Sequence, residues 1–373
     1  MERRKNLNDK FGFVVLMKIK DFIDFEQPNE YIVESDRYSN ECSTPVLTAG
    51  KSFILGYTNE GKGIYKKGPC IIFDDFTTSV HYVDFPFKVK SSAMKILTEK
   101  SNADLKYCYY LLLSLSKMPP NHKRQWISTT SEKNHVLPSM DRQISIVKQL
   151  DLISDTIVNY TNQIENLDNL VKARFIEMFK SVNDKVTIGS LCDVTSGYSF
   201  KSKDINSSNG IKLLQIGNVF FDNVNWETVN YLPDGYNIKY SKFLLNEGDI
   251  VVALTRPIIQ SLGNVKACVV RELDVPCLLN QRVGRITPKK NIDANLEFIY
   301  ECLMMNDFTK YVESCCIGCS QPNISVHDIE NYLVPNVSLK QQERFVLFKK
   351  QVDKSRFDIK KSITELEREV VYD

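Results

Sequence analysis

The sequence lacks any apolar run long enough for a membrane-spanning helix, which needs about 18–20 residues. Its beginning, MERRKNLNDKFGFVVLMKIKDF, carries charges around a short apolar run and has no small-residue cleavage site. A secretory signal of the usual kind is therefore not expected. We expect a cytoplasmic protein with no membrane partner.

The motifs of several enzyme classes are also missing. The stretch TAGKSF at 48–53 has Gly-Lys-Ser but lacks the upstream glycine of a phosphate-binding loop. The single Pro-Pro, at 119–120, lies outside the Asn/Asp-Pro-Pro-aromatic motif of an adenine methyltransferase. Asp74 and Asp75 are adjacent, so on a strand they would point to opposite faces and suit a metal poorly. The four histidines are far apart in sequence: His81, His122, His135 and His327. We therefore predict no catalytic residue, no metal and no cofactor.

Ten cysteines are scattered along the chain, mostly inside apolar runs, which favours reduced thiols in a cytosolic protein. Cys316 and Cys319 form one C-x-x-C, but no second pair or nearby histidine completes a zinc site. We interpret these cysteines as small residues of a tight loop around Gly318. The net charge of +2 gives no global attraction for nucleic acid, so any DNA binding must come from local basic loops.

One sequence motif, which we call the duplicated phrase, occurs twice. RQWISTTSEKNHVLPSMDRQISIV, at 124–147, and SQPNISVHDIENYLVPNVSLKQQERFV, at 320–346, share Gln, Ile-Ser, a proline, and then Gln and Val. After the prolines the offset is a constant 199 residues, as in Gln143 with Gln342 and Val147 with Val346. A constant offset over more than about twenty residues indicates an internal duplication.

A long helix is predicted after each proline, because residues 140–179 and 339–373 contain neither glycine nor proline. Apolar residues recur at alternating steps of three and four, the heptad spacing of a coiled coil. The expected interface comprises Leu150, Ile153, Ile157, Tyr160, Ile164, Leu167, Val352, Ile359, Ile363 and Leu366. Related by a pseudo-twofold, the two helices would pair antiparallel. Arg174, Lys349 and Arg356 interrupt the seam and should lie near its ends or face acidic neighbours.

The remaining sequence has short apolar runs bounded by turn residues, which is typical of strands in α+β domains. Shorter helices are expected at 103–117 and 294–313. The predicted order is a globular domain at 1–139, a central helix at 140–179, a second globular domain at 180–338 and a C-terminal helix at 339–373. We thus expect an α+β fold with two globular domains separated by two long helices that form an antiparallel coiled coil.

Over essentially its whole length, the chain resembles a specificity subunit of a type I restriction–modification system. The resemblance rests on the duplicated phrase, on VTIGSLCDVTSGYSF, on LNEGDIVVALTR, and on TPVLTAGKSFILGYTNEGKGIYKKGPCIIFDDFTTS, which is similar to one subtype of target-recognition domain. The resemblance implies a non-catalytic subunit whose two globular domains each read half of a bipartite site in double-stranded DNA. It also implies a helical spacer, and a scaffold for two methyltransferase (modification) subunits and for restriction subunits with motor and nuclease activity. The first domain is shorter than the second, and Cys319 stands where the family often has a hydroxyl residue.

Candidate DNA contacts are Arg, Lys, Asn, Gln, Thr and Tyr residues in loops or at strand ends, since these side chains contact base edges and phosphates. In the first domain they are Lys51, Asn59, Lys62, Lys66, Lys67, Thr77 and Thr78. In the second they are Tyr198, Lys201, Lys203, Arg256, Gln260, Gln281 and Arg282. Exposed basic residues are often only solvated, and Arg256 and Lys62 are the strongest candidates.

Two alternatives stay open at this stage. The chain could be a coiled-coil scaffold that binds proteins without reading DNA, or an enzyme with a site that no motif reveals. The duplicated phrase also has two possible roles. Gln125, Ser128, Gln321, Asn323 and Ser325 could fix the angle between globular domain and helix by capping and polar contacts, or they could contact a methyltransferase.

Overall fold

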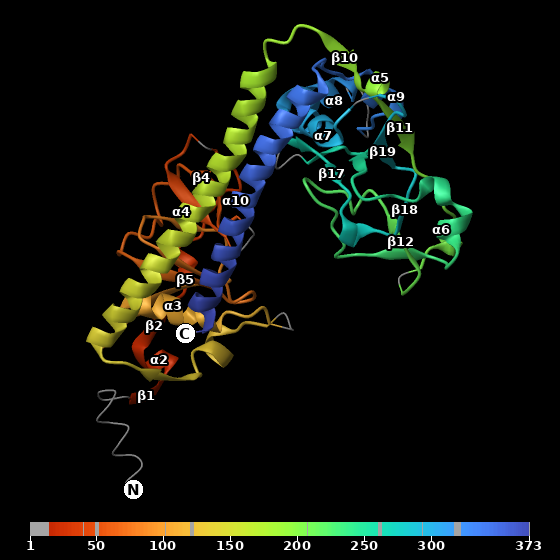
Figure 1. The fold of residues 1–373 in the computed structure, drawn as a ribbon. Helices are drawn as coiled ribbons and strands as arrows, with labels where there is room; N and C mark the ends of the chain where they lie inside the picture. The colour runs from red at the N-terminus through yellow and green to blue at the C-terminus, as the bar shows by residue number, and fades with distance from the viewer. Residues whose placement is uncertain are drawn as a thin grey trace, which may run out of the picture. The chain divides into compact units, whose positions relative to one another are not determined.

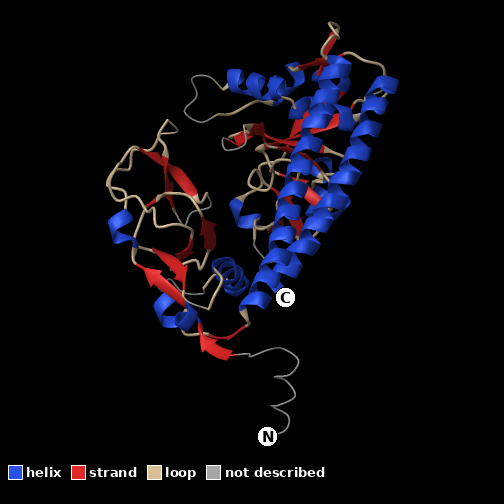
Figure 2. Cartoon of the chain, turned by 90° about the vertical axis from the view of Figure 1, so that its left-hand side faces the viewer, coloured by secondary structure: helices blue, strands red, loops and turns tan. Residues whose placement is uncertain are grey.

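The computed structural model describes residues 15–372, except 40, 49–51, 101, 120–122, 207, 260–262, 293 and 317–321 (Figure 1). The chain divides into two compact units, Met1–Gln163 with Asp358–Asp373, and Ile164–Phe357. Both units combine helices and strands, which is the mixed class that the sequence predicts (Figure 2). The long helices α4 (Met140–Phe179) and α10 (Leu339–Tyr372) each contribute to both units.

Among its described residues, the globular part of the first unit contains three sheets and the three-turn helix α3. A four-stranded sheet has the order β2-β8-β5-β6, and a three-stranded sheet has the order β4-β3-β7. The third sheet pairs β1 with β9. The elements are β1 (Val15–Lys18), α2 (Ile19–Phe22), β2 (Ile23–Glu26), β3 (Thr44–Leu47), β4 (Ile54–Thr58), β5 (Cys70–Asp74), β6 (Val80–Val83), β7 (Lys88–Val89), β8 (Met94–Glu99), α3 (Leu105–Leu115) and β9 (Asn134–Leu137).

The second unit contains a four-stranded sheet in the order β11-β19-β14-β17 and a three-stranded sheet in the order β13-β12-β18. Two-stranded pairs join β10 to β20 and β15 to β16. The elements are β10 (Lys185–Thr187), α5 (Ile188–Leu191), β11 (Cys192–Ser196), β12 (Ile211–Leu214), β13 (Asn230–Leu232), α6 (Tyr236–Lys239), β14 (Ile250–Ala253), β15 (Ile258–Ile259), β16 (Asn264–Val265), β17 (Ala267–Val269), β18 (Cys277–Leu279), β19 (Val283–Pro288), α7 (Leu296–Met304), α8 (Asn306–Cys315), α9 (Val326–Asn331) and β20 (Leu333–Pro335).

The same order of elements occurs in both units. Each starts with a strand, β1 or β10, that pairs antiparallel with the strand just before the long helix, β9 or β20. A one-turn helix follows, and then the edge strand of the four-stranded sheet, β2 or β11. Each three-stranded sheet has a parallel pair on one side, β3 with β7 or β12 with β18. The duplication that the sequence predicts therefore extends to the topology.

The core of each unit is formed where a helix packs on the four-stranded sheet. In the first unit α3 contributes Leu105, Cys108 and Leu112 to an apolar cluster that also includes Trp126. In the second unit every residue of α7 from Phe298 to Leu303 is buried. At about 25 cal/mol per Å² of apolar surface, such burial is the main stabilising contribution to each unit.

Helix 294–313 of the sequence-based prediction is wrong in one respect: it is two helices, α7 and α8, that meet at Met305. Residue 305 is extended, with φ −77° and ψ 148°. The break has a packing reason, because α7 is buried on nearly all sides whereas α8 buries only Phe308, Thr309 and Val312. A straight helix could not place both patterns against the same core. The prediction for 103–117 is confirmed by α3.

In the second unit the last turns of α4 pack against the first turns of α10. The ring centroid of Phe345 lies 5.4 Å from that of Phe175 and 5.7 Å from that of Phe179. Further along, Arg356 of α10 pairs with Asp168 of α4. Contact positions rise along one helix as they fall along the other, so these segments are antiparallel. All ten residues of the expected interface are buried or half-buried.

The three cations that interrupt the seam face acidic groups, as predicted. Arg356 contacts an Asp168 oxygen at 2.6 Å, and Lys349 lies 3.5 Å from Glu301. Arg174 pairs at 2.6 Å with the glutamate three residues on. The seam therefore contains charge only where a counter-charge is close, because an unpaired charge at a half-buried position is costly.

The two copies of the duplicated phrase have different local structures. Ser325 caps α9: its Oγ accepts the backbone N–H of Asp328, whose carboxylate accepts the backbone N–H of Ser325. Capping is thus confirmed for the second copy. Ser128 instead lies within a π-helical turn, Trp126–Thr130, and its Oγ donates to the carbonyl of Arg124. Gln125 is buried, and Gln321 lies outside the described residues.

Candidate nucleic-acid interface

One end of the four-stranded sheet in the second unit brings distant loops together. Strands β11 and β14 both run antiparallel to β19, so the ends of both lie beside the start of β19. Backbone bonds hold the connecting loops: Gln281 N donates to Tyr198 O at 3.1 Å, and Leu254 N donates to Arg282 O at 2.9 Å. The sheet thereby collects residues that are more than eighty positions apart in sequence.

Four of the predicted contact residues have exposed side chains at this strand-end surface: Tyr198, Arg256, Gln281 and Arg282. We refer to these four as the strand-end cluster. Arginine and glutamine are the side chains that form paired hydrogen bonds with base edges, and they also bind phosphates. Neither arginine has an ion-pair partner in the described part of the chain. Their charges are therefore available to an anionic ligand.

The backbone around the cluster is constrained. A Cβ on Gly197 would lie 2.3 Å from the carbonyl oxygen of Leu279, so only glycine allows β11 to end this close to the β18–β19 turn. Arg256 adopts a left-handed φ of 47°, and its N–H donates to the carbonyl of Pro322 at 2.8 Å. A non-glycine residue in this conformation is uncommon and is maintained by its surroundings. Arg256 is thus presented from a defined position.

Aromatic rings and lysines extend the same surface along the chain. The ring of Tyr198 packs against those of Tyr240 at 4.8 Å and Phe243 at 5.3 Å, which limits its rotation. Lys201 and Lys203 follow within five residues and are exposed. Gln260, the remaining candidate of this unit, lies outside the described residues.

In the first unit the candidates cluster in the loop after β4. Asn59, Lys62 and Lys66 are exposed there. The loop is anchored by Lys88 of β7, whose Nζ donates to the carbonyl of Lys62 at 2.7 Å and pairs with Glu60 at 3.0 Å. Its side chains therefore project from a fixed backbone.

The other candidates of the first unit are already engaged. Lys67 binds both oxygens of Glu26 at 2.9 Å, and this hydrogen-bonded pairing raises the pKa of Lys67. Thr77 donates its hydroxyl to Asp74, and the buried Thr78 donates its own to the carbonyl of Lys117. These two threonines stabilise the loop after β5 and do not present free hydroxyl groups. Lys51 lies outside the described residues.

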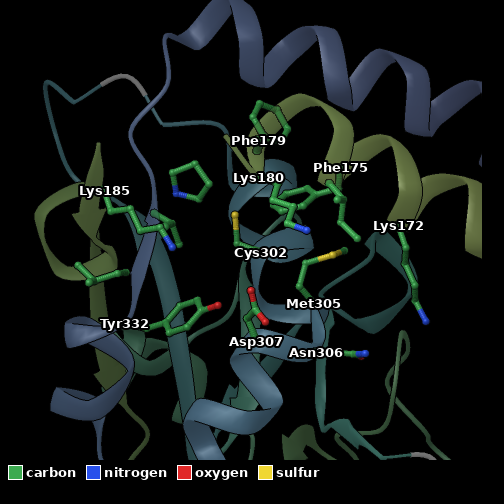
Figure 3. A pocket seen from close by; sticks show the side chains of 14 residues that line it. Lys172, Phe175, Phe179, Lys180, Lys185, Cys302, Met305, Asn306, Asp307 and Tyr332 are labelled. Carbon is green, nitrogen blue, oxygen red and sulfur yellow. The ribbon is translucent and has the colours of Figure 1, made fainter. Parts of the chain in front are cut away.

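Sequence reasoning missed a pocket of about 470 Å³ in the second unit (Figure 3). Its wall includes the apolar side chains of Phe175, Phe179 and Met305, and Figure 3 shows Lys185 at one side of it and Lys172 at the other. Four segments contribute, so no local spacing could have revealed it. The full lining is Lys172, Phe175, Ile176, Phe179, Lys180, Lys185, Cys302, Met305, Asn306, Asp307, Tyr332, Leu333, Val334 and Pro335.

No group of three or more potential metal ligands converges among the described residues. The adjacent aspartates at the end of β5, Asp74 and Asp75, have structural partners instead. Asp75 accepts the backbone N–H groups of Gln125 and Trp126 and pairs with the buried Lys95 at 3.1 Å. Within the described part of the chain, no helix is both long enough and apolar enough to cross a membrane.

Residues 181–368 match the family described as type I restriction modification DNA specificity domain. A specificity subunit of the type I restriction enzyme MjaVIII from Methanocaldococcus jannaschii is 31% identical, with 94% of this chain and 90% of the relative aligned. The EcoR124I/EcoR124II specificity subunit of Escherichia coli is 29% identical over 86% of this chain and 82% of its own length.

The chain belongs to the type I restriction–modification specificity subunits. Its fold is similar to that of a type I S subunit from M. genitalium, with a TM-score of 0.52, 17% identity, and 98% of this chain and 95% of the other covered. The predictions of a DNA-recognition subunit and of a non-enzyme are thereby confirmed.

Proposed function

We propose that this specificity subunit reads a bipartite DNA site, with one half-site bound by the globular part of each unit. The observation that carries the proposal is the repeated topology, in which two similar folds with different loops are each followed by a long helix. Two similar but non-identical reading domains suit a site whose halves differ in sequence. The globular domains at 1–139 and 180–338 are the proposed target-recognition domains.

In the second domain we assign base recognition to the strand-end cluster. Arg256 and Arg282 would bind guanine edges or phosphates, and Gln281 would bind adenine, in keeping with the donor patterns of these side chains. Lys201 and Lys203 would contact phosphates. In the first domain the equivalent assignment is Asn59 for a base edge and Lys62 and Lys66 for phosphates. Thr77 and Thr78 are left out of the assignment because their hydroxyl groups are used within the loop.

We further propose that α4 and α10 form the antiparallel coiled-coil spacer that sets the distance between the half-sites. At about 1.5 Å per residue the two helices are roughly 60 Å and 50 Å long. DNA advances about 34–36 Å per turn, so a rigid spacer of this size keeps two reading domains in a fixed register on the duplex. The buried and half-buried seam residues support this role.

The proposed partners are two modification subunits, restriction subunits and double-stranded DNA, in the cytoplasm. We assign the pocket at the end of α4 to docking of a modification subunit. Lys172, Lys180 and Lys185 have no ion-pair partner among the described residues, and Ile176 and Leu333 are each 50% exposed beside them. An acidic segment with an apolar anchor fits such a surface.

Sequencing of adenine methylation in cells tests the function directly. Cells with this gene and its methyltransferase should show a methylated bipartite motif that a strain lacking only this gene has lost. Unchanged methylation, with the protein present in its complex, would reject the proposal and favour a scaffold that does not read DNA.

The assignment of bases needs point variants. Arg256→Ala and Arg282→Ala should each lower the affinity of the complex for its site by about tenfold and relax selectivity in one half-site only. Lys310→Ala is the matched control, because Lys310 is an exposed cation on α8 outside the strand-end cluster. Equal losses for all three variants would refute the assignment.

A further inference from the structure

A buried glutamine near the start of each long helix contacts the globular part that precedes the helix. Gln143, on α4, is fully buried. Its Oε1 accepts the backbone N–H of Asp104 at 2.8 Å. Its Nε2 donates to the carbonyls of Asn102 at 3.0 Å and Pro138 at 2.9 Å. One side chain thus joins the helix, the preceding turn and the loop before α3.

Gln342, on α10, repeats the arrangement in the second unit. It is 3% exposed, and its Oε1 accepts the backbone N–H of Asn295 at 2.9 Å. Its Nε2 donates to the carbonyl of Val337 at 3.0 Å. Val337 and Pro138 each lie five residues before their glutamine. Four residues further along each helix, Val147 and Val346 are both buried in the core of their unit.

The residues that the glutamines bind have the same structural role in both units. Asp104 is the N-cap of α3, and its side chain accepts the N–H of Tyr107. Asn295 is the N-cap of α7, and its side chain accepts the N–H groups of Glu297 and Phe298. Since α3 and α7 pack on the four-stranded sheets, each glutamine connects the long helix to the element on which the globular fold is built.

The chemistry of glutamine suits this position. Its amide accepts and donates at the same time, so it satisfies a backbone N–H and backbone carbonyls that would otherwise be buried without partners. A glutamate would place a carboxylate against carbonyl oxygens. Leucine or methionine would fill the space and leave every one of these groups unsatisfied.

We infer that Gln143 and Gln342 are positioning residues, equivalent in the two units, that fix the orientation of each globular domain on its helix and so set which spacing between half-sites the protein accepts. The spacing part of this inference rests on the proposed function. We call the hydrogen bonds of each glutamine a joint. The existence of the two joints does not depend on the proposed function, because the contacts of each joint lie within its own unit.

The first experiment measures methylation by the full complex with its modification subunits on DNA whose spacer is one base pair shorter, unchanged or one base pair longer. Gln143→Leu and Gln342→Leu should each lower the preference for the native spacer by about three- to tenfold, the range that corresponds to one buried hydrogen bond. Selectivity for the bases within each half-site should stay unchanged, which a general loss of folding would not produce.

Matched controls are Gln149→Leu and Gln351→Leu, which make the same substitution at exposed positions of the same helices. The spacer preference of these variants should equal that of the wild type. An unchanged spacer preference in folded Gln143→Leu and Gln342→Leu complexes would overturn the inference. Loss of spacing and base selectivity together would also overturn it.

Amide hydrogen exchange of the wild-type complex provides a second test that needs no variant. The backbone N–H groups of Asp104 and Asn295 should exchange slowly, at rates similar to those of the helices they cap. Fast exchange at both would show that the joints are absent. If the wild type methylates no bipartite site, the proposed function and the spacing role fail together, while slow exchange at these two amides would still establish the joints.

Discussion

The two units have the same frame but use different polar contacts where the globular part meets the long helix. In the second unit, Glu301 of α7 lies 3.5 Å from Lys349 of α10. The residue at the equivalent position in the first unit is Tyr110 of α3, because Tyr110 and Glu301 each lie six residues after the N-cap of their helix. The hydroxyl of Tyr110 donates to Asp151 of α4 at 2.8 Å. At the 199-residue offset, the counterpart of Lys349 is Leu150. The glutamine and valine contacts recur, and one ion pair recurs with its charges exchanged, as Lys106 with Asp151 and as Glu297 with Lys350. The Glu301–Lys349 pair has no charged counterpart in the first unit.

This difference indicates that the recurring contacts specify how each globular part is attached to its helix, whereas the other contacts depend on the residues that each unit happens to have there. Burial raises the pKa of Glu301 to about 7, because desolvation outweighs the attraction of Lys349. Burial acts on Lys349 in the opposite sense, but Glu301 and Asp353 together raise its pKa. Asp151 is one-third exposed and is shared by Tyr110 and Lys106, so its contacts are weaker. The charged contact between globular part and helix therefore has a larger desolvation cost in the second unit, at Glu301 and Lys349, than in the first unit at Asp151.

The largest difference between the units should come from their aromatic contacts. Phe345 is fully buried against Phe175 and Phe179, whereas its counterpart at the 199-residue offset, Ile146, is half-buried. Phe345→Ala should destabilise the second unit by about 3–5 kcal/mol, and Ile146→Ala should destabilise the first by roughly 1–2 kcal/mol. Urea unfolding followed by hydrogen exchange would report each unit separately. Equal costs would mean that the two helix starts are equivalent in packing.

A pH-dependent difference should follow from Glu301. Its carboxyl group has an ordinary pKa of 4.5 and a folded-state pKa of about 7. The folded state therefore binds the proton more tightly than the unfolded state, and this contribution to stability is complete below pH 4.5 and is lost as the pH rises through 7. The unfolding free energy of the wild type should therefore fall by up to about 3 kcal/mol from pH 5 to pH 8 through this group, and Glu301→Gln should remove that fall.

The measurement is the unfolding free energy of wild type and Glu301→Gln across that range. Gln351→Leu, which changes no titratable group, is the comparison, and it should leave the pH dependence of the unfolding free energy as it is in the wild type. A constant difference between wild type and Glu301→Gln from pH 5 to pH 8 would contradict the raised pKa.

The smallest effect is expected for Tyr110→Phe. It removes one hydrogen bond to Asp151, which keeps its 2.7 Å contact with Lys106. The expected cost is about 0.5–1.5 kcal/mol, seen in hydrogen exchange of α3 and the start of α4. A cost above that of Ile146→Ala would show that this hydroxyl, and not apolar packing, maintains the first joint.

The spacing of apolar residues was sufficient to predict the long helices of the fold from the sequence. Heptad spacing predicts helix over 140–179, and α4 has these bounds. The acidic partners of Lys349 and Arg356 could be anticipated because charge in an apolar seam requires a counter-charge. The break at Met305 could not, because it depends on how α7 and α8 fit one core.

The candidate site was less accessible to sequence reasoning. The side chains of Arg256 and Arg282 could be named from their position after apolar runs, but their proximity follows from strand pairing with β19. Thr78 looked available in a polar loop, and only the structure shows its hydroxyl bound to the carbonyl of Lys117. The pocket beside Lys180 combines four segments and leaves no local signature.

The pairing of β1 with β9 and of β10 with β20 has an evolutionary consequence. Val15 lies opposite Leu137, and Lys185 lies opposite Pro335, so the chain enters and leaves each globular part through neighbouring strands. Inserted or exchanged domains are tolerated best where their two ends lie close together. Each globular part is therefore built as a unit with adjacent ends, and under the proposed function recombination at these paired ends would replace one recognition specificity without rebuilding the helices.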